Sequence, residues 1–342
     1  MLSLTLINRR SENLKQKVMR AARLHGIKNL QLEQLPVPRP GAGELLVRVE
    51  ACGVCPTDAR KYALGTSDGE YPFNPGHEWV GFVEETGPKV EGWELGDRVY
   101  GDTFGGYAEF AVVAARPTGW SCGATEMDRS VPRECAVLLE PLADCLHAVH
   151  DQARVGPGDS VLVISAGPMG LQLIAVASRV GARVLVVEPI AGRRQMAKAF
   201  GADQAVSPQE WRDAADAFTG GTGFQAIIVA VGKSELVSDA IEVAAPGGRV
   251  VAFAGFGDAP TAVIDMNRIH YGEVELVGSH WIGTPPNHRT ERYAEARDLL
   301  VSRALRLERL ITREIGLEQV QDALARHTDH QGLKTVLIPG GT

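Results

Sequence analysis

The chain of 342 residues is poor in cysteine, with only five, and no stretch reaches the ~18 consecutive apolar residues of a membrane helix. Five cysteines in a chain of this length do not make a disulfide framework, and an odd count points to a reduced compartment. The first ten residues lack the basic region and cleavage site of a secretory signal, so we expect a cytoplasmic protein. These absences argue against secreted disulfide scaffolds and integral membrane proteins.

Basic residues are in the minority. Lys and Arg total 35 against 42 Asp and Glu, which gives a formal net charge of −7. Nucleic acids and anionic membrane surfaces bind to basic faces, so we expect neither as a partner. Apolar residues make up 44% and charged residues 23%, which is typical of a globular protein. At roughly 150 residues per domain, the length predicts about two domains.

Glycine, by contrast, is abundant. The chain has 38 glycines, above the usual share of about 7%, and they follow no collagen-like period or Gly/Ser tract. We therefore expect them where the backbone turns sharply or approaches a ligand closely.

Two patterns of secondary structure divide the chain, which predicts an α/β fold. Up to about residue 120, short β segments alternate with Gly and Pro clusters, which indicates an irregular, mostly antiparallel β domain. From about residue 151, apolar strands alternate with helices, which indicates a doubly wound parallel sheet covered on both faces. The tail adds helices at 292–302 and 317–326 and a strand at 334–338, and we expect it to pack on the β domain.

A glycine-rich turn follows the apolar strand at 160–164 directly. It reads Ser165-Ala166-Gly167-Pro168-Met169-Gly170 and opens a helix, as in the dinucleotide-binding pattern G-x-G-x-x-G. Gly167 lets the backbone approach a pyrophosphate, Gly170 allows close packing of helix and strand, and the helix N-terminus offers N–H groups. Ser165 replaces the first glycine, a departure that affects the tight turn.

An acidic residue stands where such a site needs one. Glu188 ends the second strand, 18 residues after Gly170, and we expect it to bind the ribose 2′-hydroxyl and favour NAD over NADP. Arg193 and Arg194 nearby leave use of both cofactors open. We also assign Pro168, Met169 and Val231 to the cofactor site. The plainer alternative is a glycine-rich turn that holds no ligand.

A second set of residues has the chemistry of a zinc site. Cys55 precedes His77 by 22 residues, Glu78 follows at once, and Glu140 stands just before the second pattern begins. A catalytic zinc needs three ligands of these types and an open position. Taken singly, each has a plainer interpretation: Cys52 and Cys55 form a C-x-x-C pair, His77 suits a core and Glu140 suits a helix start.

The motifs CGVCPTD, PGHEWVG, EPLADCLHAV, VLVISAGPMGLQ and VVEP occur in this order, and over about residues 18–338 the chain resembles the zinc-dependent medium-chain dehydrogenases/reductases. This alcohol and polyol dehydrogenase superfamily implies a GroES-like catalytic domain at 18–150 and 288–342. It implies a Rossmann domain at 151–287, with the active site between the two domains. Residues 1–17 are then an N-terminal extension. The resemblance also implies a homodimer or homotetramer paired through the last Rossmann strands, with 250–256 as the candidate edge.

Site residues carry over by position. Cys55, His77 and Glu140 match the zinc ligands of the family. Glu78 matches a carboxylate beside the metal that exchanges with a ligand, and Thr57 matches the hydroxyl that takes the substrate's proton. Glutamate rather than cysteine at position 140 is similar to the sorbitol and threonine dehydrogenase branches.

The chain departs from the family pattern in two places. Only Cys122 and Cys135 lie where many relatives place four zinc-binding cysteines, so we expect one catalytic zinc and no structural zinc. Relatives also carry a proton-relay histidine where this chain has Pro56 or Arg60. The relay would then run through Thr57, the ribose and water, or through another group.

The resemblance implies an NAD-dependent oxidoreductase that acts on a small secondary alcohol or ketone. We expect a polyol, a sugar alcohol, a cyclitol or an amino-cyclitol as substrate. Alternatives are an L-threonine-type hydroxy amino acid dehydrogenase, a zinc-free NADPH-dependent enone or quinone reductase, and a non-enzymatic NAD sensor. Trp79, His280 and Trp281 are candidates for the pocket lining, although such residues more often pack in a core.

Overall fold

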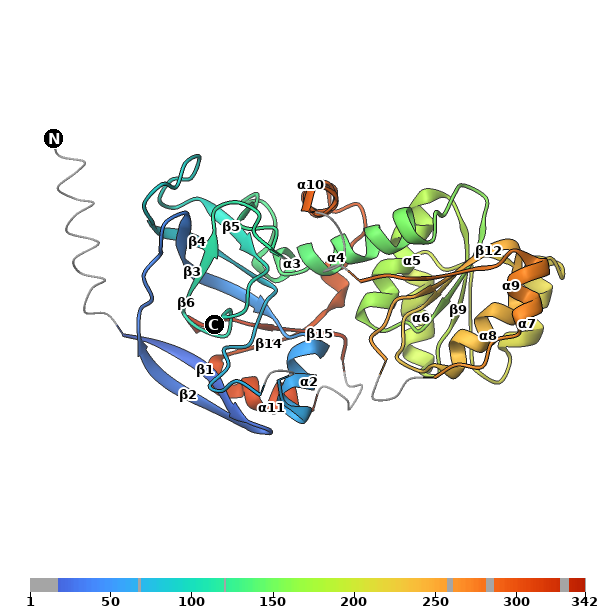
Figure 1. Ribbon diagram of the computed structural model, residues 1–342, viewed down its shortest axis with the longest axis horizontal. Coiled ribbons are helices and arrows are strands. Elements are labelled where there is room, and N and C mark those ends of the chain that lie inside the picture. Colours follow the sequence, from blue (N-terminus) through green and yellow to red (C-terminus); the bar gives the residue numbers. More distant parts are fainter. Residues whose placement is uncertain are drawn as a thin grey trace. The chain divides into compact units, whose positions relative to one another are not determined.

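The computed structural model describes residues 18–66, 69–119, 121–256, 261–280, 286–326 and 332–341 (Figure 1). The chain divides into two compact units. The first comprises the described residues of Met1–Glu140, Pro285–Arg303 and Leu307–Thr342, and the second those of Pro141–Thr284 and Ala304–Arg306. The domain boundaries expected from the sequence, after residue 150 and before residue 288, stay a prediction.

The first unit is built on a sheet with the strand order β14-β15-β3-β4-β5-β7, in which β6 also pairs with β3, and β1 and β2 form a separate hairpin. Its strands are β1 (Val18–Gly26), β2 (Asn29–Pro36), β3 (Glu44–Gly53), β4 (Trp79–Thr86), β5 (Arg98–Gly101), β6 (Phe110–Ala114), β7 (Thr125–Glu126), β14 (Ile311–Ile315) and β15 (Lys334–Leu337). The tail strands β14 and β15 thus join the N-terminal strands, as the sequence led us to expect. The sequence analysis had missed β14.

The helices of this unit are short except the last but one. They are α2 (Pro56–Leu64), α3 (Arg133–Ala136), α10 (Pro286–Ser302) and α11 (Val320–Ala325), with 3₁₀ turns η3 (Leu307–Leu310) and η4 (Leu317–Gln319). The sequence had predicted one helix over 317–326, which the structure divides into η4 and α11. Helix α4 (Leu139–Leu146) begins in the first unit, with Leu139 and Glu140, and its other residues belong to the second unit. It continues there as the π-helix η1 (His147–Gln152).

Strand β3 is the centre on which the candidate metal site depends. It pairs antiparallel with β4, Cys52 opposite Trp79, and on its other side with β15, Val336 opposite Gly53. The end of β3, the start of β4 and the start of β15 therefore meet. Residues just outside these strand ends lie close together although they are far apart in sequence.

The second unit is a six-stranded parallel sheet with the order β10-β9-β8-β11-β12-β13. Its strands are β8 (Ser160–Ile164), β9 (Arg183–Val187), β10 (Gln204–Val206), β11 (Phe224–Val229), β12 (Ala244–Ala252) and β13 (Glu275–Gly278). Its helices are α5 (Pro168–Val180), α6 (Ala191–Ala199), α7 (Trp211–Thr219), α8 (Glu235–Val243) and α9 (Met266–Gly272). All residues of β8 are buried, as expected of a parallel strand covered on both faces.

The expected edge of this sheet was wrong. The sequence analysis placed the edge at 250–256, but β12 pairs with β11 on one side and with β13 on the other. A sixth strand continues the parallel order after β12, so β13 forms this edge among the described residues. In that part of the chain no helix is both long enough and apolar enough to cross a membrane.

Candidate functional site

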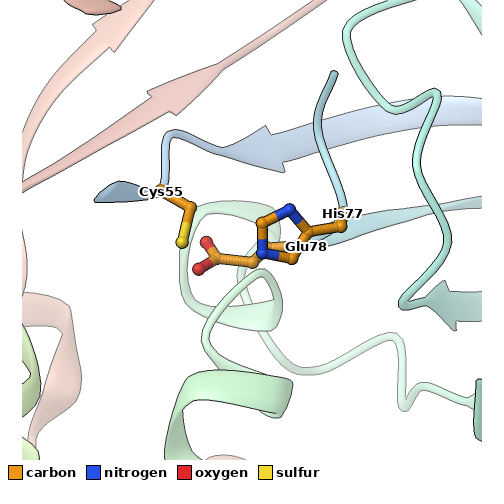
Figure 2. A group of neighbouring side chains, drawn as sticks. All are labelled: Cys55, His77 and Glu78. Atoms are coloured by element: carbon orange, nitrogen blue, oxygen red, sulfur yellow. The ribbon is translucent and has the colours of Figure 1, made fainter. Parts of the chain in front are cut away.

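Cys55, His77 and Glu78 form one compact group in the first unit. Their ligand atoms all lie within 4.8 Å of one another, and the Glu78 carboxylate points toward the Cys55 sulfur (Figure 2). The pairing of β3 with β4 explains this, because Cys55 follows the end of β3 and His77 and Glu78 precede β4. Cys55 also precedes Pro56, the first residue of α2, where proline is favoured.

Asp58 orients the imidazole of His77. Its buried carboxylate accepts hydrogen bonds from the Gly76 N–H and the Tyr107 hydroxyl, both at 3.1 Å, which hold it in place. The His77 Nδ1 lies 3.4 Å from Asp58 Oδ2 and makes no regular hydrogen bond. Nε2 is therefore the atom left to bind a metal, with Nδ1 directed to a carboxylate, as is usual for metal-bound histidine.

The surroundings of Cys55 and His77 raise the pKa of both groups. Burial raises the pKa of the Cys55 thiol, and the negative charge of Glu78 raises it further. Burial by itself lowers the pKa of His77, but the charges of Asp58 and Cys55 outweigh it, so that the pKa lies well above its usual value. Each of these ligands therefore holds its proton more tightly than in water.

Glu140, at the second position of α4, belongs to the same electrostatic environment. Burial raises its pKa to about 7, His77 opposes this shift and Glu78 adds to it. Glu140 is not, however, a member of the group within 4.8 Å. Which carboxylate is the third ligand is thus not fixed by proximity alone.

These residues fit a zinc ion. A thiol, an imidazole and carboxylates are the ligand types that zinc prefers, and here they are gathered in one place in which Glu78 is buried and Cys55 and His77 are half-buried. Buried carboxylates without a compensating positive charge are unfavourable, and a divalent cation would provide that charge.

The sequence analysis missed two residues of this site, Asp58 and Lys334. Asp58 stands in the CGVCPTD motif itself, so its role was detectable, since metal-bound histidines commonly have a carboxylate behind them. Lys334 forms an ion pair with Glu78 through Nζ and Oε2, across 256 residues of sequence. No local pattern marks it.

The other residues that the sequence proposed for catalysis or for the substrate pocket lie in both units. Thr57 is exposed in the first turn of α2, beside Cys55. Trp79 is fully buried and donates its indole N–H to the Thr103 carbonyl, so the interpretation as core packing holds. His280 is exposed in the second unit, and Trp281 lies outside the described residues.

In the second unit, the glycine-rich turn keeps its shape despite Ser165. This residue adopts φ +102°, a region that favours glycine, and its Oγ accepts a hydrogen bond of 3.2 Å from the Gly167 N–H. A Cβ on Gly170 would lie 2.1 Å from the Ser165 carbonyl oxygen. Gly167 is the N-cap of α5 and has room, since its Cβ would only reach ordinary contact with the Ser165 side chain.

The first turn of α5 offers backbone donors. Pro168 carries no N–H, and the N–H groups of Met169 and Gly170 have no acceptor within the helix because they belong to its first turn. Such donors, together with the positive end of the helix dipole, suit a phosphate.

Glu188 follows β9 and is buried. Its carboxylate accepts from the Ala166 N–H at 2.7 Å and from the Ile190 N–H at 3.0 Å, which ties the glycine-rich turn to the end of β9. Arg194 donates to the Glu188 and Pro189 carbonyls.

The remaining candidates for the cofactor site are half-buried. Arg193 lies in the first turn of α6. Val231 follows β11, whose last residue Val229 pairs with Ile164 at the end of β8. The strand ends that carry the glycine-rich turn, Glu188 and Val231 are thus neighbours where the strand order reverses, the usual nucleotide position in such sheets.

Alanine substitutions at the two glycines of the turn should have different effects, one on stability and the other on NAD binding. In G170A the new methyl group has no room against the Ser165 carbonyl, so we expect a loss of about 1–3 kcal/mol in unfolding free energy. G167A is the matched control, with a loss below about 1 kcal/mol but weaker NAD binding. Urea unfolding and nucleotide titration measure the two effects. Equal stability losses in both variants would contradict the packing role of Gly170.

Zinc affinity should rise with pH. Zinc binding removes the proton of Glu140, whose pKa is about 7, so below that pH this group alone lowers the apparent affinity about tenfold per unit. Above pH 7 its contribution disappears. Titrations of the metal-free protein between pH 5 and 8 measure the slope, to which Cys55 and His77 also contribute. In E140Q the slope below pH 7 should decrease by about one; an unchanged slope excludes Glu140 as a ligand.

Comparisons with known proteins agree with this geometry. The alcohol dehydrogenase GroES-like domain family matches residues 41–122, and the zinc-binding dehydrogenase family matches residues 168–302. L-threonine 3-dehydrogenase of Pyrococcus horikoshii is 32% identical over 86% of this chain and 90% of its own length.

Two solved structures are similar over nearly the whole chain. A zinc-binding dehydrogenase from Sinorhizobium meliloti bound to NADP is 26% identical, with a TM-score of 0.84 over 95% of this chain and 100% of that chain. The rspB alcohol dehydrogenase of Escherichia coli in complex with NADH is 25% identical, with a TM-score of 0.82 over 94% and 99%. The chain belongs to the zinc-dependent medium-chain alcohol dehydrogenase superfamily.

Proposed function

We propose that the protein oxidises a secondary alcohol reversibly to a ketone with NAD, using one catalytic zinc ion held by Cys55, His77 and Glu140. The observation that carries the proposal is the compact group of Cys55, His77 and Glu78, whose ligand atoms lie within 4.8 Å of one another. Neither of the two alternatives, a zinc-free reductase or a non-enzymatic NAD sensor, requires such a group of metal-binding side chains.

Zinc in this site would act as a Lewis acid that lowers the pKa of the substrate hydroxyl. The residues of the chain orient and balance it. Asp58 holds the His77 ring, and Lys334 offsets the charge of Glu78. A site fixed in this way before substrate arrives needs little rearrangement during the reaction.

Thr57 takes up the proton of the substrate hydroxyl. It directly follows Pro56 in the first turn of α2, two residues after Cys55, and its exposure allows the proton to pass to solvent. Pro56 has no titratable group, and the guanidinium of Arg60 offers hydrogen-bond donors but no acceptor, so neither replaces the missing histidine. The proton would then leave through the Thr57 hydroxyl and water.

The cofactor is NAD, which accepts the hydride. The N–H groups in the first turn of α5 would hold a phosphate of the cofactor, and Glu188 would accept hydrogen bonds from the ribose hydroxyls. A 2′-phosphate would approach this buried carboxylate, which repels it. Arg194 is already engaged by two carbonyl groups, which supports NAD over NADP.

The substrate belongs to the polyols, sugar alcohols, cyclitols or amino-cyclitols. A glutamate among the ligands, in place of a second cysteine, supports this choice. The second candidate is a hydroxy amino acid, which is favoured by the similarity to L-threonine 3-dehydrogenase.

Activity and metal content test the proposal together. We expect NAD⁺-dependent turnover with at least one member of a panel of polyols, cyclitols and L-threonine, lower turnover with NADP⁺, and about one zinc per chain. C55A should lose both zinc and turnover, because it removes the thiolate ligand. C135A, which removes a buried cysteine outside the group, should keep both. Full activity of a zinc-free C55A variant would refute the zinc assignment.

We also propose that the protein pairs through β13. Among the described residues β13 has no partner beyond β12, and such an edge strand offers unpaired backbone groups. Leu276 exposes an apolar side chain on the strand, and Tyr271, four residues before its start, is 79% exposed. A dimer or tetramer that covers this edge would bury them.

Light scattering after size-exclusion chromatography tests the pairing. We expect the wild type to elute as a dimer or tetramer and Y271D/L276E to elute as a smaller species, since both changes place charges at the edge. I27D alters another exposed apolar residue, on the turn between β1 and β2, and should keep the oligomer. A wild-type monomer would refute the proposal.

A further inference from the structure

A buried lysine stands beside the candidate zinc ligands. The Lys334 ammonium group pairs with Glu78 Oε2, and the two residues are only 5% and 2% exposed. Burial by itself lowers the pKa of Lys334, but the negative charges of Glu78 and Cys55 raise it above the usual value, so the ammonium stays charged. A charged pair this deeply buried needs a local reason.

The backbone around the pair leaves room for these side chains and for little else. A Cβ on Gly53 would lie 2.1 Å from Glu78 Oε2 and 3.0 Å from Lys334 Cε. The Val54 N–H donates to the Thr335 carbonyl at 2.9 Å, which fixes the start of β15 beside the end of β3. The ammonium is therefore held in place by the sheet itself.

Two carboxylates are available for one metal position. The ligand atoms of Glu78, Cys55 and His77 lie within 4.8 Å of one another, whereas Glu140 is half-buried, interacts electrostatically with His77 and Glu78, and belongs to no such close group. If both carboxylates bound, zinc would have four protein ligands. Four protein ligands are typical of a structural zinc site, while a catalytic site keeps one position open.

We propose that Lys334 is a positioning residue that keeps Glu78 off the zinc ion, so that Glu140 completes the site and the fourth position stays open to substrate. The ammonium and the metal compete for the carboxylate of Glu78, and the ion pair with Lys334 prevents Glu78 from binding the metal. This inference rests on the zinc site of the proposed function, but concerns how that site is kept open.

K334M tests the inference through metal release. Without the ammonium, Glu78 becomes a fourth protein ligand, so we expect zinc to pass to a chelator at least about tenfold more slowly than from the wild type. In Co²⁺-substituted wild type, added imidazole should bind the open position and shift the visible absorption spectrum. In K334M this shift should be lost. K334R keeps a positive charge and should restore both properties toward wild type.

A double variant separates this effect from a loss of packing. E78Q/K334M removes both charges, so it leaves no unpaired buried ion, and it should release zinc at nearly the wild-type rate and recover the imidazole shift. It also carries the test if K334M alone does not fold. Faster zinc release from either variant would overturn the inference, as would unchanged release from K334M. A wild type that binds no zinc would instead refute the proposed function.

Discussion

The antiparallel pairing of β3 with both β4 and β15 is the constraint on which the candidate metal site depends. Because Cys52 lies opposite Trp79 and Gly53 opposite Val336, three strand ends meet at one point. The backbone thus brings Cys55, Glu78 and their neighbours together before any side chain interaction is considered. A shift of one residue in either register would turn these side chains to the other face of the sheet.

Charge governs what can occupy this point. A thiol, an imidazole and two carboxylates are gathered there, largely shielded from solvent, and apart from a metal the nearest positive charge that compensates them is Lys334. Burial raises the pKa of Glu140 and of Cys55, which shows how unfavourable their charged forms are in the absence of a cation. A divalent ion at this point would favour the charged forms of both groups. The second unit needs no such compensation, because its phosphate position relies on backbone N–H groups.

Local patterns in the sequence were sufficient for much of the architecture. The strand at 160–164 occurs at its expected bounds and a helix follows the glycine-rich turn as expected, because an apolar run and glycines mark them directly. The turn around Gly167 could be recognised from the sequence for the same reason. The close grouping of Cys55 with His77 and Glu78 was also expected, on the strength of a resemblance rather than of spacing.

What the sequence did not reveal depends on contacts between distant segments. Lys334 carries no motif, and only the pairing of β15 with β3 brings it to Glu78. The sequence analysis misplaced the edge of the second sheet because strand order is a property of the whole sheet. The local sequence at 250–256 does not distinguish a central strand from an edge strand. Asp58 belongs to a motif that the sequence analysis quoted, but it received no role there. A carboxylate next to a cysteine motif can have many roles, and only the structure shows that it faces His77.

The distance along the chain between Glu78 and Lys334, 256 residues, has a consequence for the order of assembly. During synthesis, Cys55, His77 and Glu78 leave the ribosome long before β15 exists, and domains generally begin to fold from the N-terminal side. In that interval no ammonium restrains Glu78. A zinc ion captured early would meet a different set of ligands from one that arrives after β15 has paired with β3, so the timing of metal delivery matters for this fold.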